Sequence, residues 1–286
     1  MTAVPTHQVK GASPLRYPGG KSALSGFLAS TIAKMGLRRP TTYVEPYAGG
    51  AGAALTLLQS GTVQSLVIND ADPAIYAFWA AAVHQNREFR DLIHETPVTL
   101  QEWHRQREIY RERDYNKALQ LGFATFFLNR TNRSGVLNAG VIGGQKQAGR
   151  YKVDARFNKE DLLRRVALLE DFGPSIRVSG LDGRSVIREH IRLKRSFIYA
   201  DPPYYDKGSF LYKNSFTRED HALLASLLNS NPHANWLLTY DNATDIRALY
   251  AGRHTKLFDL SYSAHRSGKM TELMIASDKV AQALAD

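Results

Sequence analysis

The sequence of 286 residues contains no cysteine. Disulfide bridges and thiolate metal sites are therefore excluded, and we expect a reducing, intracellular setting. No apolar run approaches the roughly 18 residues of a membrane-spanning helix. The first residues, MTAVPTHQVKGASP, lack the apolar core of a signal peptide. The nine histidines show no metal-ligand spacing, so we predict no metal site.

What the chain does contain is an ordinary share of apolar residues and an excess of cations. Hydrophobic residues make up 43%, enough for a substantial core. Lys and Arg number 37 against 27 Asp and Glu, which gives a net charge of +10. A basic soluble protein attracts polyanions, and nucleic acid is the most common of these. The alternative is that the charge serves only solubility.

The order of predicted elements indicates an α/β protein. Strand-like and helix-like segments alternate at the start of the chain: 41–47, 51–61, 65–70, and a helix opened by Pro73. That order predicts a mostly parallel sheet. The middle is charge-dense and helical, and 159–172 is a further helix with Asn158 as its N-cap. Alternation then returns and ends in two strands joined by AHRSGKM, which predicts an antiparallel hairpin. We therefore expect one sheet, built from residues 1–75 and 175–286, with a basic, mostly helical insertion at 76–174.

The stretch FIYADPPYYD, residues 197–206, places a carboxylate directly after a probable buried strand. Ligands of open α/β sheets bind at the carboxyl ends of strands, which is where Asp201 falls. Two prolines stiffen the following backbone and remove two N–H donors. The Asp201 carboxylate and the Pro202 carbonyl can then face outward as paired acceptors for an –NH₂ group, with Tyr204 as a flat face for its ring. The alternative is a simple proline turn after a strand.

A second candidate site follows the first predicted strand, at VEPYAGGAG. A glycine-rich turn before a helix lets a ligand approach the backbone closely. The glycine spacing is not that of the dinucleotide fingerprint, and Glu45 stands directly before the turn, where it would repel pyrophosphate. Asp70 follows Gly50 by 20 residues and ends the next strand, a position from which an acid can bind ribose hydroxyls. Together these features favour a nucleoside-type ligand.

The order of RYPGGK, VEPYAGGAG, IND, LNRTNRSG, DPPY and HRSGKMTELMI resembles that of Dam-type (D12 class) DNA adenine N6-methyltransferases over nearly the whole chain. The resemblance implies a Rossmann-like methyltransferase sheet with an inserted target-recognition domain. It also implies S-adenosyl-L-methionine as cofactor and an adenine flipped out of double-stranded DNA as substrate.

Site residues carry over from the resemblance position by position. The catalytic motif corresponds to Asp201, Pro202, Pro203 and Tyr204. The cofactor contacts near the methionine part correspond to Tyr17 and Lys21, those of the first strand to Glu45, Tyr47 and Gly49, and the ribose-binding acid to Asp70, with Asp201 as a further contact.

The predicted DNA contacts are less specific. Dam-type enzymes carry an aromatic wedge after LNR, where this chain has Thr131, Asn132 and Arg133, so the recognition sequence does not carry over. Arg130, Asn132 and Arg133 could read bases, hold phosphates or lie in a solvated loop. His265, Arg266 and Lys269, in the terminal hairpin, could clamp the DNA backbone or cap a turn.

These observations predict a DNA adenine N6-methyltransferase of the bacterial or phage cytoplasm, associated with the nucleoid and acting as a monomer. Methylation of cytosine N4 or of RNA stays open, because any flat –NH₂ substrate satisfies the paired acceptors. A non-catalytic DNA-binding regulator is a second alternative, against which the intact DPPY motif argues. Whether a restriction endonuclease accompanies the enzyme is also left open.

Overall fold

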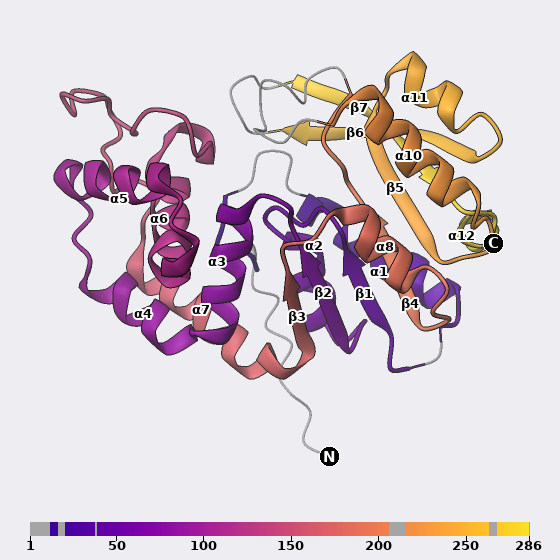
Figure 1. The fold of residues 1–286 in the computed structure, drawn as a ribbon, viewed down its shortest axis with the longest axis horizontal. Helices are drawn as coiled ribbons and strands as arrows, with labels where there is room; N and C mark the ends of the chain where they lie inside the picture. Colours follow the sequence, from indigo (N-terminus) through magenta and orange to yellow (C-terminus); the bar gives the residue numbers. More distant parts are fainter. Residues whose placement is uncertain (1–11, 17–20, 38, 206–215, 263–267, 286) are drawn as a thin grey trace.

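The computed structural model describes residues 12–16, 21–37, 39–205, 216–262 and 268–285, with side chains omitted at 260–262 and 268–270 (Figure 1). Within these residues no helix combines the length and the apolar character that crossing a membrane requires.

A seven-stranded sheet with the order β3-β2-β1-β4-β5-β7-β6 organises the chain. Its strands are β1 (Thr42–Glu45), β2 (Ser65–Asn69), β3 (Ile176–Ser179), β4 (Ser196–Ala200), β5 (Trp236–Asp241), β6 (His254–Tyr262) and β7 (Gly268–Ala276). Strands β3, β2, β1, β4 and β5, in their order across the sheet, are all parallel. Strand β7 runs antiparallel to both β5 and β6. The predicted α/β class, the mostly parallel sheet and the C-terminal antiparallel hairpin are confirmed.

Alternation along the strands divides the apolar side chains between the two faces of the sheet. Val44, Ile198 and Leu238 face a cluster that includes residues from α8 (Gly183–His190), α10 (Arg218–Asn229) and α11 (Thr244–Leu249). Their neighbours in sequence, such as Tyr43 and Phe197, face the opposite cluster. That second cluster includes residues from α1 (Ser25–Lys34), α2 (Gly52–Gln59) and α12 (Asp278–Ala285). Because both faces are covered, the central strands carry apolar side chains on both sides, as in other buried parallel sheets.

The interval between β2 and β3 is mostly helical (Figure 1). They are α3 (Pro73–His84), α4 (Asn86–Glu95), α5 (Leu100–Glu112), α6 (Ala118–Thr131) and α7 (Lys159–Phe172), with short 3₁₀ turns at Tyr115–Lys117, Arg133–Gly135 and Gly173–Ser175. The expected insertion, 76–174, falls inside this helical segment, whose first helix begins three residues earlier. Asp72 caps α3, and Asn158 caps α7 as predicted from sequence.

Helix α6 forms the centre of the helical segment. Every residue from Leu121 to Thr131 is buried, including the polar Asn129 and Arg130 near the end of the helix. Helix α3 approaches so closely that a Cβ atom on Gly122 would lie 2.4 Å from the carbonyl oxygen of Ala77. Phe78 and Phe126 belong to the same apolar cluster as Tyr43 of β1. The helical segment therefore shares one continuous core with the sheet, which fixes its position relative to the strand ends.

Candidate active site

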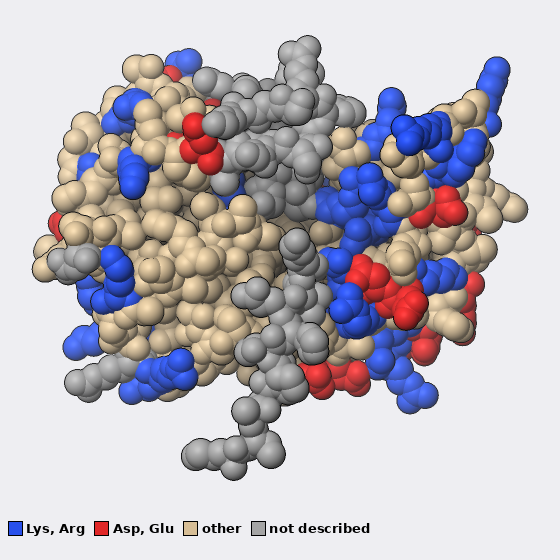
Figure 2. Space-filling view, turned by 180° about the vertical axis from the view of Figure 1, so that it is seen from behind, with Lys and Arg blue, Asp and Glu red and all other residues tan. Residues whose placement is uncertain are grey.

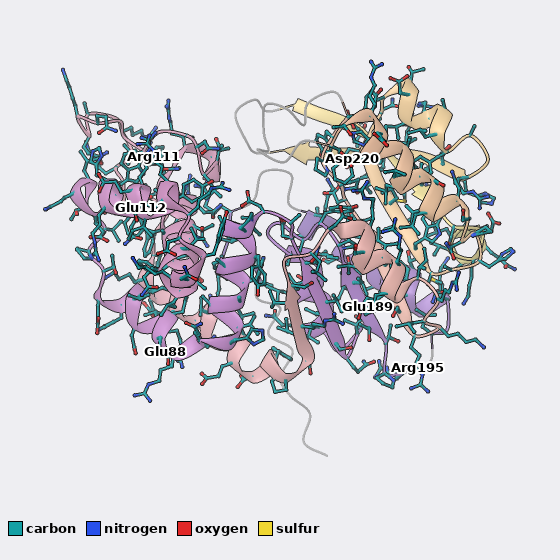
Figure 3. All side chains as sticks on the ribbon, in the orientation of Figure 1. Glu88, Arg111, Glu112, Glu189, Arg195 and Asp220 are labelled. Carbon is teal, nitrogen blue, oxygen red and sulfur yellow. The ribbon has the colours of Figure 1, made fainter. Side chains whose placement is uncertain are left out.

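Two of the predicted site residues, Glu45 and Asp201, lie at the point where the direction of chain winding reverses. Strands β1 and β4 are adjacent and parallel, and the chain proceeds from them toward opposite edges, to β2 and to β5. The carboxyl ends of two such strands border a crevice, the usual ligand site of an open α/β sheet. Glu45 ends β1, and Asp201 directly follows β4. In Figure 3, Arg195 marks the amino edge of β4, and Asp220, near the start of α10, lies toward the opposite edge.

Asp201 is held through both of its carboxylate oxygens. Lys21 Nζ, from the 3₁₀ turn Lys21–Leu24, lies 3.0 Å from Oδ2. Thr239 Oγ1 donates to Oδ1 at 2.7 Å, and Thr239 in turn shares a hydrogen bond of 2.8 Å with Tyr199. Loss of hydration raises the pKa of Asp201, an effect that Lys21 opposes and a second carboxylate, Glu272, reinforces. With 23% of its side chain exposed, Asp201 stays accessible from the crevice.

Glu272 of β7 joins Asp201, Lys21 and Tyr204 in one network. Tyr204 donates its phenol hydrogen to Glu272 Oε1 at 2.6 Å. Lys21 Nζ lies 3.2 Å from the same oxygen and 5.6 Å from the centre of the Tyr204 ring. Glu272 is fully buried. Our interpretation of the sequence missed this residue, although a glutamate within the apolar run TELMIA was a signal, since an acid is buried only when it is paired.

Glu45 stands on the same face of the sheet and is also buried, with 5% of its surface exposed. The Tyr43 hydroxyl donates to Glu45 Oε1 at 3.1 Å. The Tyr43 ring packs parallel to those of Phe197 and Tyr199, which keeps it against β4. Burial raises the pKa of Glu45 to about 8, with a further contribution from the charge of Asp201. Glu45 is therefore neutral at pH 7 unless a positive charge approaches it.

Asp70 and the glycine turn form one unit. Asp70 Oδ2 accepts from the backbone N–H of Gly49 at 2.9 Å, and Oδ1 accepts from that of Asp72 at 2.9 Å. The turn needs this support because Gly49 and Ala51 have φ values of +46° and +44°. Burial raises the pKa of Asp70 to about 6, while the two backbone donors lower it. Each oxygen keeps a lone pair, so Asp70 can hold the turn and still accept from a ligand hydroxyl.

Asn69 and Tyr47 lie near the strand ends on the side of β3. The Asn69 amide donates to the carbonyl oxygens of Pro46 and Leu181 at 2.8 and 2.9 Å, so it ties the ends of β1 and β3 together. The Tyr47 ring lies against Gly183, where a Cβ atom would come within 2.3 Å of it. The Tyr47 hydroxyl is buried and has no hydrogen-bond partner among the residues that the structure describes. Sequence analysis missed Asn69, whose position at the last residue of β2 was the available signal.

The family model for D12 class N6 adenine-specific DNA methyltransferases matches residues 17–268. The chain belongs to this family. The resemblance inferred from RYPGGK and DPPY is thereby confirmed. The protein is an adenine-specific DNA methyltransferase. Among solved structures, the rRNA methyltransferase aviRa from Streptomyces viridochromogenes matches with 13% identity and a TM-score of 0.38. That alignment covers 99% of this chain and 91% of the other. No curated protein matches at a significant level.

The methyltransferase places its three predicted loop residues in different surroundings. Arg130 is 8% exposed, and its Nε donates to the Pro14 carbonyl at 2.8 Å. Burial, with Arg165 and Arg16 nearby, lowers the pKa of Arg130 to about 9. Asn132 is fully buried. Arg133 is exposed, and its guanidinium lies over Gly140, where a Cβ atom would come within 3.0 Å of it. Of the three side chains, that of Arg133 is the most accessible to DNA.

Several predicted residues lie outside the described part of the methyltransferase. These are Tyr17, His265 and Arg266, together with the side chain of Lys269. Of the prolines in the catalytic motif, Pro202 is buried and Pro203 is partly exposed.

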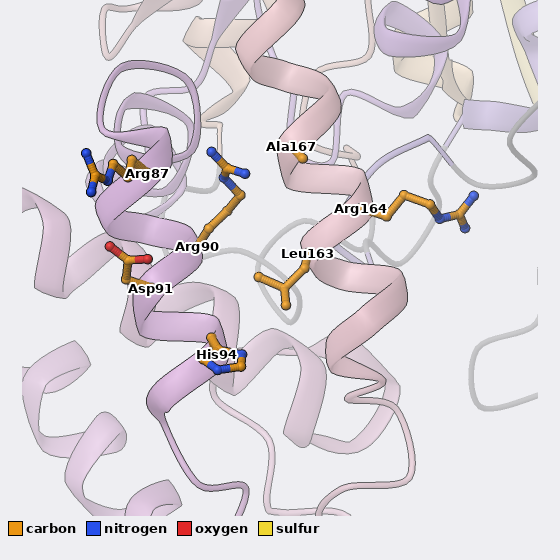
Figure 4. Close-up of a pocket in the computed structure, with 7 residues that line it drawn as sticks. All are labelled: Arg87, Arg90, Asp91, His94, Leu163, Arg164 and Ala167. Carbon is orange, nitrogen blue, oxygen red and sulfur yellow. The ribbon is translucent and has the colours of Figure 1, made fainter.

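Part of the basic charge of the enzyme lies on the helical segment. Figure 2 shows the molecule from behind, with the helical segment on the right. Lys and Arg side chains lie close together on that half, interspersed with acids. A pocket of about 520 Å³ between α4 and α7 belongs to this surface (Figure 4). It is lined by Arg87, Arg90, Asp91, His94, Leu163, Arg164 and Ala167. None of these residues was predicted as a site residue, and none belongs to the Asp201 network.

Proposed function

We propose that the enzyme transfers a methyl group from S-adenosyl-L-methionine to N6 of an adenine flipped out of double-stranded DNA. The observation that carries this proposal is the Asp201 carboxylate, which is oriented from two sides and stays accessible beside Tyr204 in the crevice between β1 and β4. The family supplies the reaction class, and the arrangement of these side chains suits the amine of a planar base.

The charge of the crevice fits the proposed cofactor. Two carboxylates, from Asp201 and Glu272, pair with the ammonium group of Lys21, and the charge of Asp201 acts on nearby Glu45. A ligand that carries positive charge relieves the repulsion between them. When bound, S-adenosyl-L-methionine supplies an electrophilic methyl group on a positively charged sulfur. We assign its binding to Lys21, Glu45, Tyr47, Gly49, Asp70 and Asp201, with Tyr17 from the sequence motif, and its ribose to Asp70.

The chain's part in the chemistry is to prepare the adenine amine. Its lone pair is delocalised into the ring, so the amine is a poor nucleophile. Hydrogen bonds from its two hydrogens to Asp201 and the Pro202 carbonyl favour a pyramidal nitrogen with a localised lone pair. Asp201 then accepts the proton that the methylated nitrogen releases, for which its raised pKa is suited. Stacking on the Tyr204 ring contributes about 1–3 kcal/mol to holding the base.

The helical segment supplies DNA contact in this proposal. An adenine inside a duplex cannot reach Asp201, so it must leave the base stack. Arg133 is our candidate for base contact, and the other cations of the segment hold phosphates. His265, Arg266 and Lys269 remain proposed backbone contacts.

The direct test is to incubate the purified enzyme with duplex DNA and methyl-labelled S-adenosyl-L-methionine. The DNA is then digested to nucleosides, which are separated by chromatography. We expect label in N6-methyladenine. Label in N4-methylcytosine alone, or transfer to RNA but not to DNA, would contradict the proposal. Asp201→Ala serves as the control for labelling that does not depend on the site. Methylation-sensitive sequencing of DNA from cells that express the enzyme then identifies the recognition sequence.

A further inference from the structure

Lys21 lies between two carboxylates of the active site. Its Nζ is 3.0 Å from Asp201 Oδ2 and 3.2 Å from Glu272 Oε1, and its side chain is 6% exposed. A buried ammonium group is stable only while it is paired. When Lys21 moves away from one of the two carboxylates, the other still compensates its charge.

This arrangement creates a competition at Asp201. Oδ1 already accepts from Thr239, and Oδ2 is occupied by Lys21. The proposed reaction needs an Asp201 oxygen for the adenine amine. A neutral amine is a weaker partner for a carboxylate than an ammonium group is. Each Asp201 oxygen keeps a further lone pair, but the amine binds less strongly to a carboxylate whose charge Lys21 compensates, so this bond becomes stronger when Lys21 moves toward Glu272.

We propose that Glu272 is a positioning residue that receives Lys21 when the adenine amine binds Asp201. The inference rests on the proposed function and extends it to a residue outside the DPPY motif. Glu272 is fully buried, comes from β7, and already accepts from Lys21, so the ammonium keeps a charged partner after it leaves Asp201. The bond from Tyr204 to Glu272, at 2.6 Å, fixes the proposed stacking ring during the same change.

The test compares Glu272→Gln with the parent enzyme at saturating S-adenosylhomocysteine. Glutamine has nearly the same shape and still accepts from Tyr204, but it cannot compensate the charge of Lys21. The readout is duplex binding, with adenine or with unsubstituted purine at the target position. Purine lacks the amine, so with an abasic site opposite the target, which removes the contribution of base pairing, the ratio of the two affinities reports the bonds of the amine to Asp201 and Pro202. We expect the parent to favour adenine about tenfold or more, since the bond involves a charged group. In Glu272→Gln this preference should fall close to one, with methyl transfer reduced about tenfold or more.

The decisive comparison repeats the substitution in a Lys21→Met background. Without the ammonium group there is no competitor at Asp201, so Glu272→Gln should no longer lower the adenine preference. Such non-additivity marks two residues that act through one interaction. Asp259→Asn is the matched control, because it removes an exposed carboxylate from the neighbouring strand β6, where its partner is Thr271. We expect it to leave both the preference and the rate unchanged.

Two results would overturn the inference. One is an unchanged adenine preference in Glu272→Gln. The other is an equal loss with and without Lys21, which would give Glu272 a structural role only. Thermal unfolding of each variant shows whether the fold survives. Failure of the proposed function is a separate result, since the parent enzyme itself would then transfer no methyl group to adenine.

Discussion

Trp103 Nε1 donates to the side-chain oxygen of Asn132 at 2.7 Å, and both side chains are fully buried. The Asn132 amide also donates to the carbonyl oxygens of Val136 and Leu137, at 3.0 and 2.9 Å. Asn132 thus joins α5 to the loop that contains Arg133. The surrounding backbone pairs as well, with Arg133 N donating to the Gly140 carbonyl at 3.0 Å. The base of the loop is therefore rigidly attached to the helices.

Replacing Asn132 by Ala should destabilise the enzyme. Three hydrogen bonds are lost, of which the one from Trp103 is buried and the other two are partly buried. The indole N–H and two carbonyl groups lose their partner, so we expect a loss of about 2–4 kcal/mol in the free energy of unfolding. Urea denaturation measures this value. The matched control is Asn116→Ala, whose side chain is exposed, and it should change stability by less than about 0.5 kcal/mol. Equal stability of the two variants would show that the contact with Trp103 contributes nothing.

Arg133→Ala tests how the loop contacts DNA. A base contact would cost about 1–3 kcal/mol at the recognition sequence alone and relax one position of it. A phosphate contact would weaken binding to all sequences alike and reduce the salt slope by about 1. We expect the first outcome, because the guanidinium is exposed at the end of a rigid loop. Binding isotherms on specific and unrelated duplexes at several salt concentrations separate the two. Arg87→Ala, in the pocket between α4 and α7, is the control for a phosphate contact, because we propose that the other cations of the segment hold phosphates.

The sheet could be predicted because its signals are local. Apolar runs bounded by glycine, proline and acids marked the strands, and Asp70 and Asp201 fell at strand ends, where ligands bind. The contacts of Glu272 could not be predicted in this way, since Lys21 lies 251 residues away in sequence. The role of Asn132 could not be predicted either, because its partner Trp103 is also distant in sequence. In a segment rich in glycine and asparagine it resembles a solvated residue, and only the position of Trp103 makes it a buried one.

The raised pKa of Glu45 makes cofactor binding depend on pH. In the free enzyme Glu45 has a pKa of about 8 and is neutral at pH 7. A bound positive charge favours the ionised form, lowers this pKa and releases a proton. Affinity for S-adenosyl-L-methionine should therefore rise as the pH increases toward about 8, by at most about tenfold per pH unit, and level off above it. Because the cofactor's own amine also titrates, the informative quantity is the difference between the parent and Glu45→Gln.

Calorimetry in buffers of different ionisation enthalpy counts the protons released. We expect a substantial release at pH 7 in the parent enzyme that Glu45→Gln lacks. S-adenosylhomocysteine, which has no sulfonium charge, should release fewer protons than the cofactor does. Equal proton release in the parent and in Glu45→Gln would show that Glu45 does not change its ionisation on binding.

Asp201→Ala tests the centre of the proposed mechanism. It removes one of the two acceptors for the adenine amine, and we expect methyl transfer to fall by about 100-fold or more, which corresponds to about 3 kcal/mol of barrier lowering. DNA binding should persist, because the cations of the helical segment are unchanged and phosphate contacts supply most nonspecific affinity. Single-turnover labelling measures the rate, and a binding isotherm on the same duplex provides the control. Lys21 and Thr239 lose their shared partner, so thermal unfolding must accompany both measurements. A folded variant that methylates DNA at nearly the parental rate would remove Asp201 from the chemistry and leave it as a support for Lys21.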